Sequence, residues 1–144
     1  MRYTFIFSIL LLLTLAACTK NKFNTVPSLK YKSANTKTLH NGETLKLTLS
    51  FTDAEGDVID TILIREFVRA CAANPKGGFI DSSNTLPTFP TGKNQKGDII
   101  ISYPYSSINP RCNRNDTAVF KFVLRDNANH FSDTAVSDPI VIIF

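Results

Sequence analysis

The stretch ETLKLTLSFT, residues 43–52, carries the alternation that decides the fold. Polar and apolar residues take turns along it, so one face of an extended strand would carry only Leu45, Leu47, Leu49 and Phe51. Successive side chains of a strand point to opposite faces, and the pattern therefore predicts a strand with one buried face and one wet face. Such a strand needs a second layer over its apolar side, which indicates stacked sheets.

The same period-two pattern recurs along the chain. We expect further strands near residues 26–31, 58–68, 86–89, 97–105, 117–125 and 134–144, with turn signals such as Asn41-Gly42 between them. No segment shows the spacing of an amphipathic helix. The sequence predicts an all-β fold: a single antiparallel β-sandwich of about seven strands over residues 26–144, with Ig-like topology.

The chain begins like an exported protein. An apolar run follows Arg2 and is too short to cross a bilayer core. It ends in Leu15-Ala16-Ala17-Cys18, and here the chain resembles bacterial lipoproteins, whose lipobox closes on an acylated cysteine. The resemblance implies a signal peptide over residues 1–17 and a lipid-anchored tether over residues 18–25. The alternative is an ordinary signal peptide cut by another peptidase, in which Cys18 carries no lipid.

Acylation would make the membrane the first partner of this protein, because two or three acyl chains hold a protein far more firmly than one. Fully stretched, residues 19–25 reach at most about 25 Å, so the domain would stay close to the bilayer. The segment after Cys18 lacks the acidic run that resembles surface-export signals. We therefore expect an outer-membrane anchor that faces the periplasm rather than the cell surface.

Composition and motifs exclude several function classes. The formal net charge of +4 is spread along the chain, with no basic stripe or recognition motif, so no nucleic-acid partner is expected. The chain has no nucleophile elbow, zinc-protease motif or phosphate loop. We expect no enzyme activity, and the remaining route to one is a pair of carboxylates that meets only in the fold.

Two cysteines remain after the anchor, Cys71 and Cys112. An even number of cysteines in an oxidising compartment favours a disulfide between them. Neither belongs to a C-x-x-C pair, and His40 and His130 are distant in sequence, which disfavours a metal site or a catalytic thiol. The predicted disulfide would link the irregular segment after residue 70 covalently to the sandwich.

An acidic turn follows the first strong strand, with Asp53, Glu55 and Asp57 in the sequence DAEGD. It is no EF-hand, because its glycine precedes the fifth ligand position and Ile64 stands where the closing glutamate belongs. In Ig-like topology the loop before the last strand emerges at the same end, and that loop supplies Asp126, Asn127 and Asn129. No cofactor is required, but these oxygens suit a Ca²⁺ site. The alternative is that both loops are plain turns, which favour the same residue types.

Aromatic residues in the Pro- and Gly-rich segment 74–110 offer a second candidate site. Phe89, Tyr103 and Tyr105 would form a glycan- or peptide-binding platform if they were exposed. The alternative is that they fill the core of a small domain that has no tryptophan.

The mature chain also resembles small bacterial lipoproteins with a single Ig-like, cadherin-like or PKD-like domain. The residues that carry the resemblance are Leu49-Ser50-Phe51-Thr52-Asp53, the turn over residues 53–57 and the closing segment over residues 122–129. The resemblance implies a non-catalytic binding or structural module of the cell envelope, whose partner is an envelope protein or a glycan.

Overall fold

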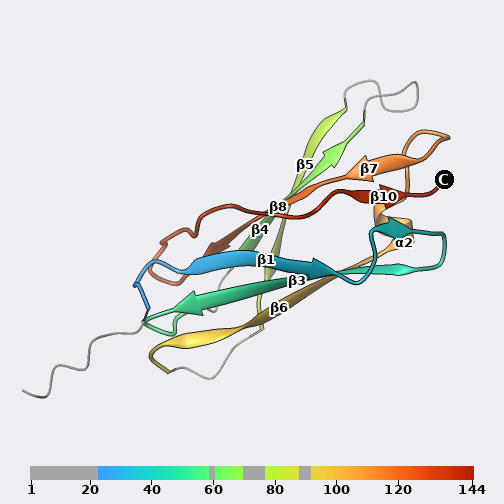
Figure 1. Cartoon of the computed structure of the whole chain (residues 1–144). Helices are drawn as coiled ribbons and strands as arrows, with labels where there is room; N and C mark the ends of the chain where they lie inside the picture. The colour runs from blue at the N-terminus through green and yellow to red at the C-terminus, as the bar shows by residue number, and fades with distance from the viewer. Residues whose placement is uncertain (1–22, 59–60, 70–76, 88–91) are drawn as a thin grey trace, which may run out of the picture.

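The computed structural model describes residues 23–58, 61–69, 77–87 and 92–144, and the fold is given for these (Figure 1). They form ten strands and one four-residue helix: β1 (Ser28–Ala34), β2 (Thr38–Leu39), β3 (Thr44–Asp53), β4 (Thr61–Val68), β5 (Gly78–Thr85), β6 (Gln95–Pro104), α2 (Tyr105–Ile108), β7 (Asp116–Ala118), β8 (Phe120–Arg125), β9 (Ala135–Val136) and β10 (Ile140–Ile142). The all-β prediction is confirmed. Among the residues described, no helix has the length and apolarity needed to cross a membrane.

Backbone hydrogen bonds join the strands into three sheets, in the orders β1-β3-β6, β5-β4-β8-β9 and β2-β10-β7. Every pair is antiparallel except β2 with β10. Two of the expected strands, over residues 117–125 and 134–144, change sheet part way along, from β7 to β8 and from β9 to β10. The short β2, which lies beyond the strand expected near residues 26–31, pairs with β10 in the third sheet.

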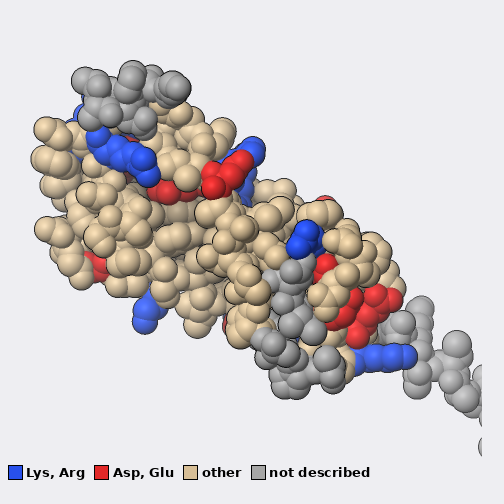
Figure 2. Space-filling view, turned by 180° about the vertical axis from the view of Figure 1, so that it is seen from behind, with Lys and Arg blue, Asp and Glu red and all other residues tan. Residues whose placement is uncertain are grey.

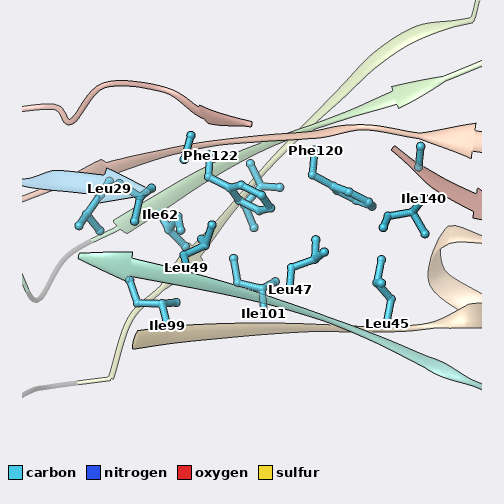
Figure 3. Close-up of a cluster of buried hydrophobic side chains, with 14 of the residues drawn as sticks. Leu29, Leu45, Leu47, Leu49, Ile62, Ile99, Ile101, Phe120, Phe122 and Ile140 are labelled. Atoms are coloured by element: carbon cyan, nitrogen blue, oxygen red, sulfur yellow. The ribbon is translucent and has the colours of Figure 1, made fainter. Parts of the chain in front are cut away.

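The sheets β1-β3-β6 and β5-β4-β8-β9 face each other across one apolar core (Figure 3). The β3 side chains predicted to point inward are fully or almost fully buried. On the facing sheet, the inward side chains of β8 are Phe120, Phe122 and Leu124, which are buried in the same core. Phe120 stacks on Phe122 with ring centroids 6.3 Å apart. Each buried Leu or Phe stabilises the fold by about 1.5–3 kcal/mol, so this contact between layers is the main source of stability.

The irregular segment differs from its prediction. The strand expected over residues 86–89 is wrong at Leu86 and Pro87, because the strand of this region is β5 and it ends at Thr85. Its sequence GFIDSSNT has no apolar alternation, since β5 pairs with β4 alone at the edge of its sheet and most of its residues are exposed. Edge strands bury little, so periodicity cannot find them.

One end of the molecule, which we call the N-terminal pole, gathers residues 23–26, 53–58, 92–95 and 126–131 (Figure 1). Ala54 N donates to Asn24 O over 3.0 Å, and Asn94 N donates to Ala54 O over 2.8 Å. Phe23 N donates to Asn94 Oδ1 over 3.3 Å. The acidic turn is thus hydrogen-bonded both to the start of the domain and to the loop before β6.

Gly56→Ala tests the close packing at this pole. Gly56 has a φ of +74°, and a Cβ there would overlap the carbonyl oxygen of Gly92. Gly42 has a φ of +84° but nothing within 4 Å of the same position. We expect Gly42→Ala to lower the free energy of unfolding by about 1 kcal/mol, from backbone strain alone, and Gly56→Ala by about 2–4 kcal/mol. Urea denaturation measures both, and equal losses would contradict the packing described.

Candidate metal centre

Two buried carboxylates end the apolar stripes of the two facing sheets. In β3 the inward positions run from Leu45 to Phe51, and the next inward position is Asp53. In β8 they run from Phe120 to Leu124, and the next one along the chain is Asp126. Both aspartates have 0% exposure. The alternation that builds the core therefore places two carboxylates opposite each other at the N-terminal pole.

Asp57 completes the group. One carboxylate oxygen from each of Asp53, Asp57 and Asp126 lies within 4.8 Å of the others. The two loops are also joined through the backbone, because Asn127 N donates to Asp57 O over 3.3 Å. Figure 2 shows acidic side chains gathered at this end of the molecule. The convergence of the two loops is what the Ig-like prediction requires.

Hydrogen bonds hold two of the carboxylates in place. Asp53 Oδ2 accepts from Gly56 N over 2.6 Å and from Asp57 N over 3.3 Å. Asp126 Oδ1 accepts from His130 N over 2.7 Å, and His130 Nδ1 lies 3.0 Å from Asp126 Oδ2. These are the contacts of polar turns, so the plain-turn interpretation accounts for part of the arrangement.

The turn interpretation leaves two oxygens unexplained. Asp53 Oδ1 and Asp57 Oδ1 are both buried and have no hydrogen-bond partner. Burial raises the pKa of the Asp57 carboxyl, and the charges of Asp126 and Asp53 raise it further. A buried acceptor without a donor costs about 1–3 kcal/mol, and carboxylates packed together repel. Both costs would vanish if a cation lay between them.

The geometry fits a hard divalent cation. Two oxygens that bind one Ca²⁺ at about 2.3–2.6 Å each can be at most about 5 Å apart, and the three carboxylates meet that limit. Calcium takes six to eight oxygens in flexible geometry, which carboxylates, backbone carbonyls and water can supply. Sulfur and imidazole ligands are not part of this group, which disfavours softer metals.

Three of the predicted ligands lie outside the carboxylate group. Glu55, Asn127 and Asn129 are exposed, and Asn129 N donates to Asp126 O over 3.1 Å with a φ of +65°, as a turn residue does. Sequence reasoning missed His130, which holds Asp126, and Gln95, the register partner of Asp53 on the inward face of β6. The sequence feature that predicts burial of Asp53 and Asp126 is their position: each continues the inward-facing alternation of its strand, β3 or β8.

Two of the three residues of the predicted aromatic platform, Tyr103 and Tyr105, are half-buried and pack against the core. Tyr103 packs on the core and stacks on Phe120 with ring centroids 5.1 Å apart. Tyr105 also packs on the core, and its hydroxyl donates to Ile143 O over 2.6 Å. Phe89 lies outside the described residues. The two tyrosines took the core role because they continue the inward side of β6 into the turn that follows.

The opposite pole holds a carboxyl that the sequence analysis overlooked. Glu66 occupies the inward phase of β4 between Ile64 and Val68. Burial raises its pKa to about 7, against a lowering by Arg111, and Asp116 adds to the rise. The adjoining cavity, which Glu66, Arg111 and Asp116 line, has a volume of only ≈ 20 Å³. Between the described residues, that is room for about one water beside this carboxyl.

Two of the three cysteines, Cys18 and Cys71, lie outside the described residues. Cys112 is buried, and its Sγ lies 3.9 Å from the carbonyl oxygen of Arg69, two residues before Cys71 in the chain. The disulfide and the acylation therefore stay predictions.

Comparisons with known proteins add little. No protein-family model matches the chain, and no curated protein matches it. Among solved structures, the sporulation control protein Spo0M from Bacillus subtilis is similar to it at 10% sequence identity and a TM-score of 0.48, over 83% of this chain. This chain spans 50% of the length of that protein. At this level of likeness we take no functional conclusion from Spo0M.

Glu66 predicts a pH dependence of stability. Its pKa is about 7 in the folded protein, against an ordinary value of 4.5. The contribution of Glu66 to the free energy of unfolding is therefore fully present below pH 4.5 and is lost as pH rises through 7. With allowance for solvent at this half-buried position, the loss is about 1–2 kcal/mol. We expect Glu66→Gln to remove this decline and Glu43→Gln, at an exposed site, to leave it in place. Urea denaturation between pH 4 and 8 decides, and a decline unchanged in Glu66→Gln would contradict the assignment.

Proposed function

We propose that this protein is a membrane-anchored, non-catalytic module of the cell envelope, an Ig-like domain whose N-terminal pole is stabilised by Ca²⁺. The observation that carries the proposal is the group of Asp53, Asp57 and Asp126, two of them fully buried and two with an unpartnered buried oxygen. Gathering three carboxylates, two of them fully buried, is costly unless a cation lies between them, so the arrangement is suited to cation binding.

The strand order supports the Ig-like assignment. The sheet β1-β3-β6 corresponds to Ig strands A, B and E, and the sheet β5-β4-β8-β9 corresponds to C′, C, F and G. The short β2 leaves the first sheet and pairs in parallel with β10, the continuation of the last strand. A first strand shared between both sheets is typical of Ig-like domains.

The location of the calcium site supports the link to a membrane. Asn24 and Phe23, near the end of the proposed tether, are hydrogen-bonded to Ala54 and Asn94 beside the acidic group. A cation that orders this pole would also fix the direction in which the tether leaves the domain. With only residues 19–25 between the acylated Cys18 and the domain, this pole would face the bilayer.

Calcium titration tests the metal site. For the wild-type chain, saturating Ca²⁺ at a hundred times its Kd is expected to raise the free energy of unfolding by about 2.7 kcal/mol, seen as a higher Tm. Asp57→Asn is expected to raise the Tm without calcium, because the variant loses like-charge repulsion, and to abolish the calcium response. The opposite signs of these two effects separate metal binding from a general loss of stability.

Glu55→Gln is the matched control, since Glu55 lies in the same turn but outside the carboxylate group. It should keep the full response. Magnesium at equal concentration is expected to give a smaller shift, because Mg²⁺ demands octahedral ligands at about 2.0–2.1 Å and sheds water reluctantly. No change in the wild-type Tm at millimolar Ca²⁺ would remove the metal from the proposal.

Cys18→Ala tests the anchor independently. Expressed in a Gram-negative bacterium, the wild-type chain is expected in the outer-membrane fraction with an added diacylglyceryl mass, and the variant in neither form. Cys112→Ser is the control, because it should keep the lipid while losing the predicted bridge to Cys71. An unmodified wild-type protein recovered in the soluble fraction would contradict the anchor but leave the calcium site untouched.

A further inference from the structure

The outer face of the sheet β5-β4-β8-β9 is unusually apolar for a solvated surface. The strand register sets Phe79 beside Phe67 and, further along, Leu63 beside Val123. Phe79 is 54% exposed and Phe67 is 40% exposed. Their rings meet edge to face at 5.8 Å. Exposed apolar side chains that gather on one face, rather than lie scattered, mark a binding surface.

Cations surround this aromatic pair. Arg65 Cζ lies 5.5 Å and Lys121 Nζ 5.6 Å from the ring centroid of Phe79. Arg65 is fixed by Asp81, to which its Nη2 donates over 2.7 Å, and its Nε pairs with the other oxygen of that carboxylate. Among the described residues, no carboxylate forms an ion pair with Lys121. The cluster is thus largely preorganised and has one ammonium available for an anion.

Charge on this face is one-sided. The outward positions of the four strands carry Arg65, Lys121 and Arg125 but only one carboxylate, Asp81. Asp81 neutralises Arg65, which leaves the ammonium of Lys121 as a positive group on this face. A ligand that complements the face carries at least one negative group.

A groove of ≈ 320 Å³ lies beside the cluster, and we call it the outer-face groove. Its floor is formed by Leu63 and Val123, which are register partners on β4 and β8 and so form a flat apolar surface. Its rim carries two cations, one carboxylate and one hydroxyl, from Arg65, Lys121, Asp81 and Thr134. The volume is that of a small-ligand site.

We propose that the outer-face groove binds the uronate residues of an acidic polysaccharide. A uronate ring has an apolar C–H face for the floor and for the edge of Phe79, hydroxyls for Asp81 and Thr134, and a carboxylate for Lys121. A neutral sugar leaves the ammonium without a partner. An acidic peptide satisfies the cations, but its hydroxyl-poor backbone makes less use of the rim. The site shares no residue with the calcium site, so each proposal stands or fails alone.

The test uses the full chain in detergent, with oligogalacturonate and alginate oligosaccharides as probes and dextran as the neutral comparison, all in EDTA so that the acidic pole takes no part. Calorimetry is expected to show salt-sensitive binding of the uronates and none of dextran. Lys121→Gln should weaken uronate binding at least about tenfold, with an unchanged Tm. Lys46→Gln, at an exposed position of β3 in the other sheet, is the matched control and should bind as the wild-type chain does.

Four outcomes would overturn the proposal: no uronate binding, equal binding by wild type and Lys121→Gln, equal loss in Lys46→Gln, or dextran binding of similar strength. A Glu-Val repeat peptide is titrated in parallel. If it binds in a Lys121-dependent way and the uronates do not, the groove is a peptide site and the glycan proposal is wrong.

Phe79→Leu gives a second readout, since it keeps apolar bulk but removes the ring, and it should weaken uronate binding while sparing the fold.

Discussion

The structure depends on one constraint: the inward side of each strand must match the inward side of the strand it faces across the core. Along most of β3 and β8 the match is apolar, with Leu47 and Leu49 facing the stacked rings of Phe120 and Phe122 (Figure 3). At the N-terminal pole the same phase brings Asp53 and Asp126 into the interior. At this end the core is therefore bounded by buried carboxylates rather than by solvent-exposed side chains. Their oxygens need hydrogen-bond donors or a cation as partners.

This closure explains why the pole is so densely connected. The hydrogen bonds of Asp53 to its own turn and of Asp126 to His130 hold the carboxylates at the cost of bringing like charges together. Gly56 is needed because the neighbouring loop passes where a Cβ would stand. The start of the domain at Phe23 and Asn24 bonds to the same loops. In the proposed function, the same loops therefore bind the cation, pack against each other and set the direction of the tether.

The two ends of the domain manage buried charge differently. At the opposite pole Glu66 also points inward, but it lies beside Arg111 and a cavity for about one water, and its raised pKa of about 7 allows it to be neutral. Among the described residues no second carboxyl is hydrogen-bonded to it, and protonation relieves the cost of its burial. Between the poles, the outer face of the β5-β4-β8-β9 sheet is solvated, and Phe79, Arg65 and Lys121 contact one another there rather than in the core.

The sequence by itself determined the fold class, the inward residues of β3, β6 and β8, and the two loops that carry the acidic group, because period-two burial is a local property that each strand displays alone. It failed at β5, an exposed edge strand without alternation, and it left open whether Tyr103 and Tyr105 lie on a surface or pack on the core. Only the tertiary structure decided that Asp57 joins Asp53 and Asp126 while Glu55, Asn127 and Asn129 do not, and that Phe79, Arg65 and Lys121 meet on one face. Those distances arise between segments far apart in the chain, where register and loop packing, rather than local pattern, set which side chains touch.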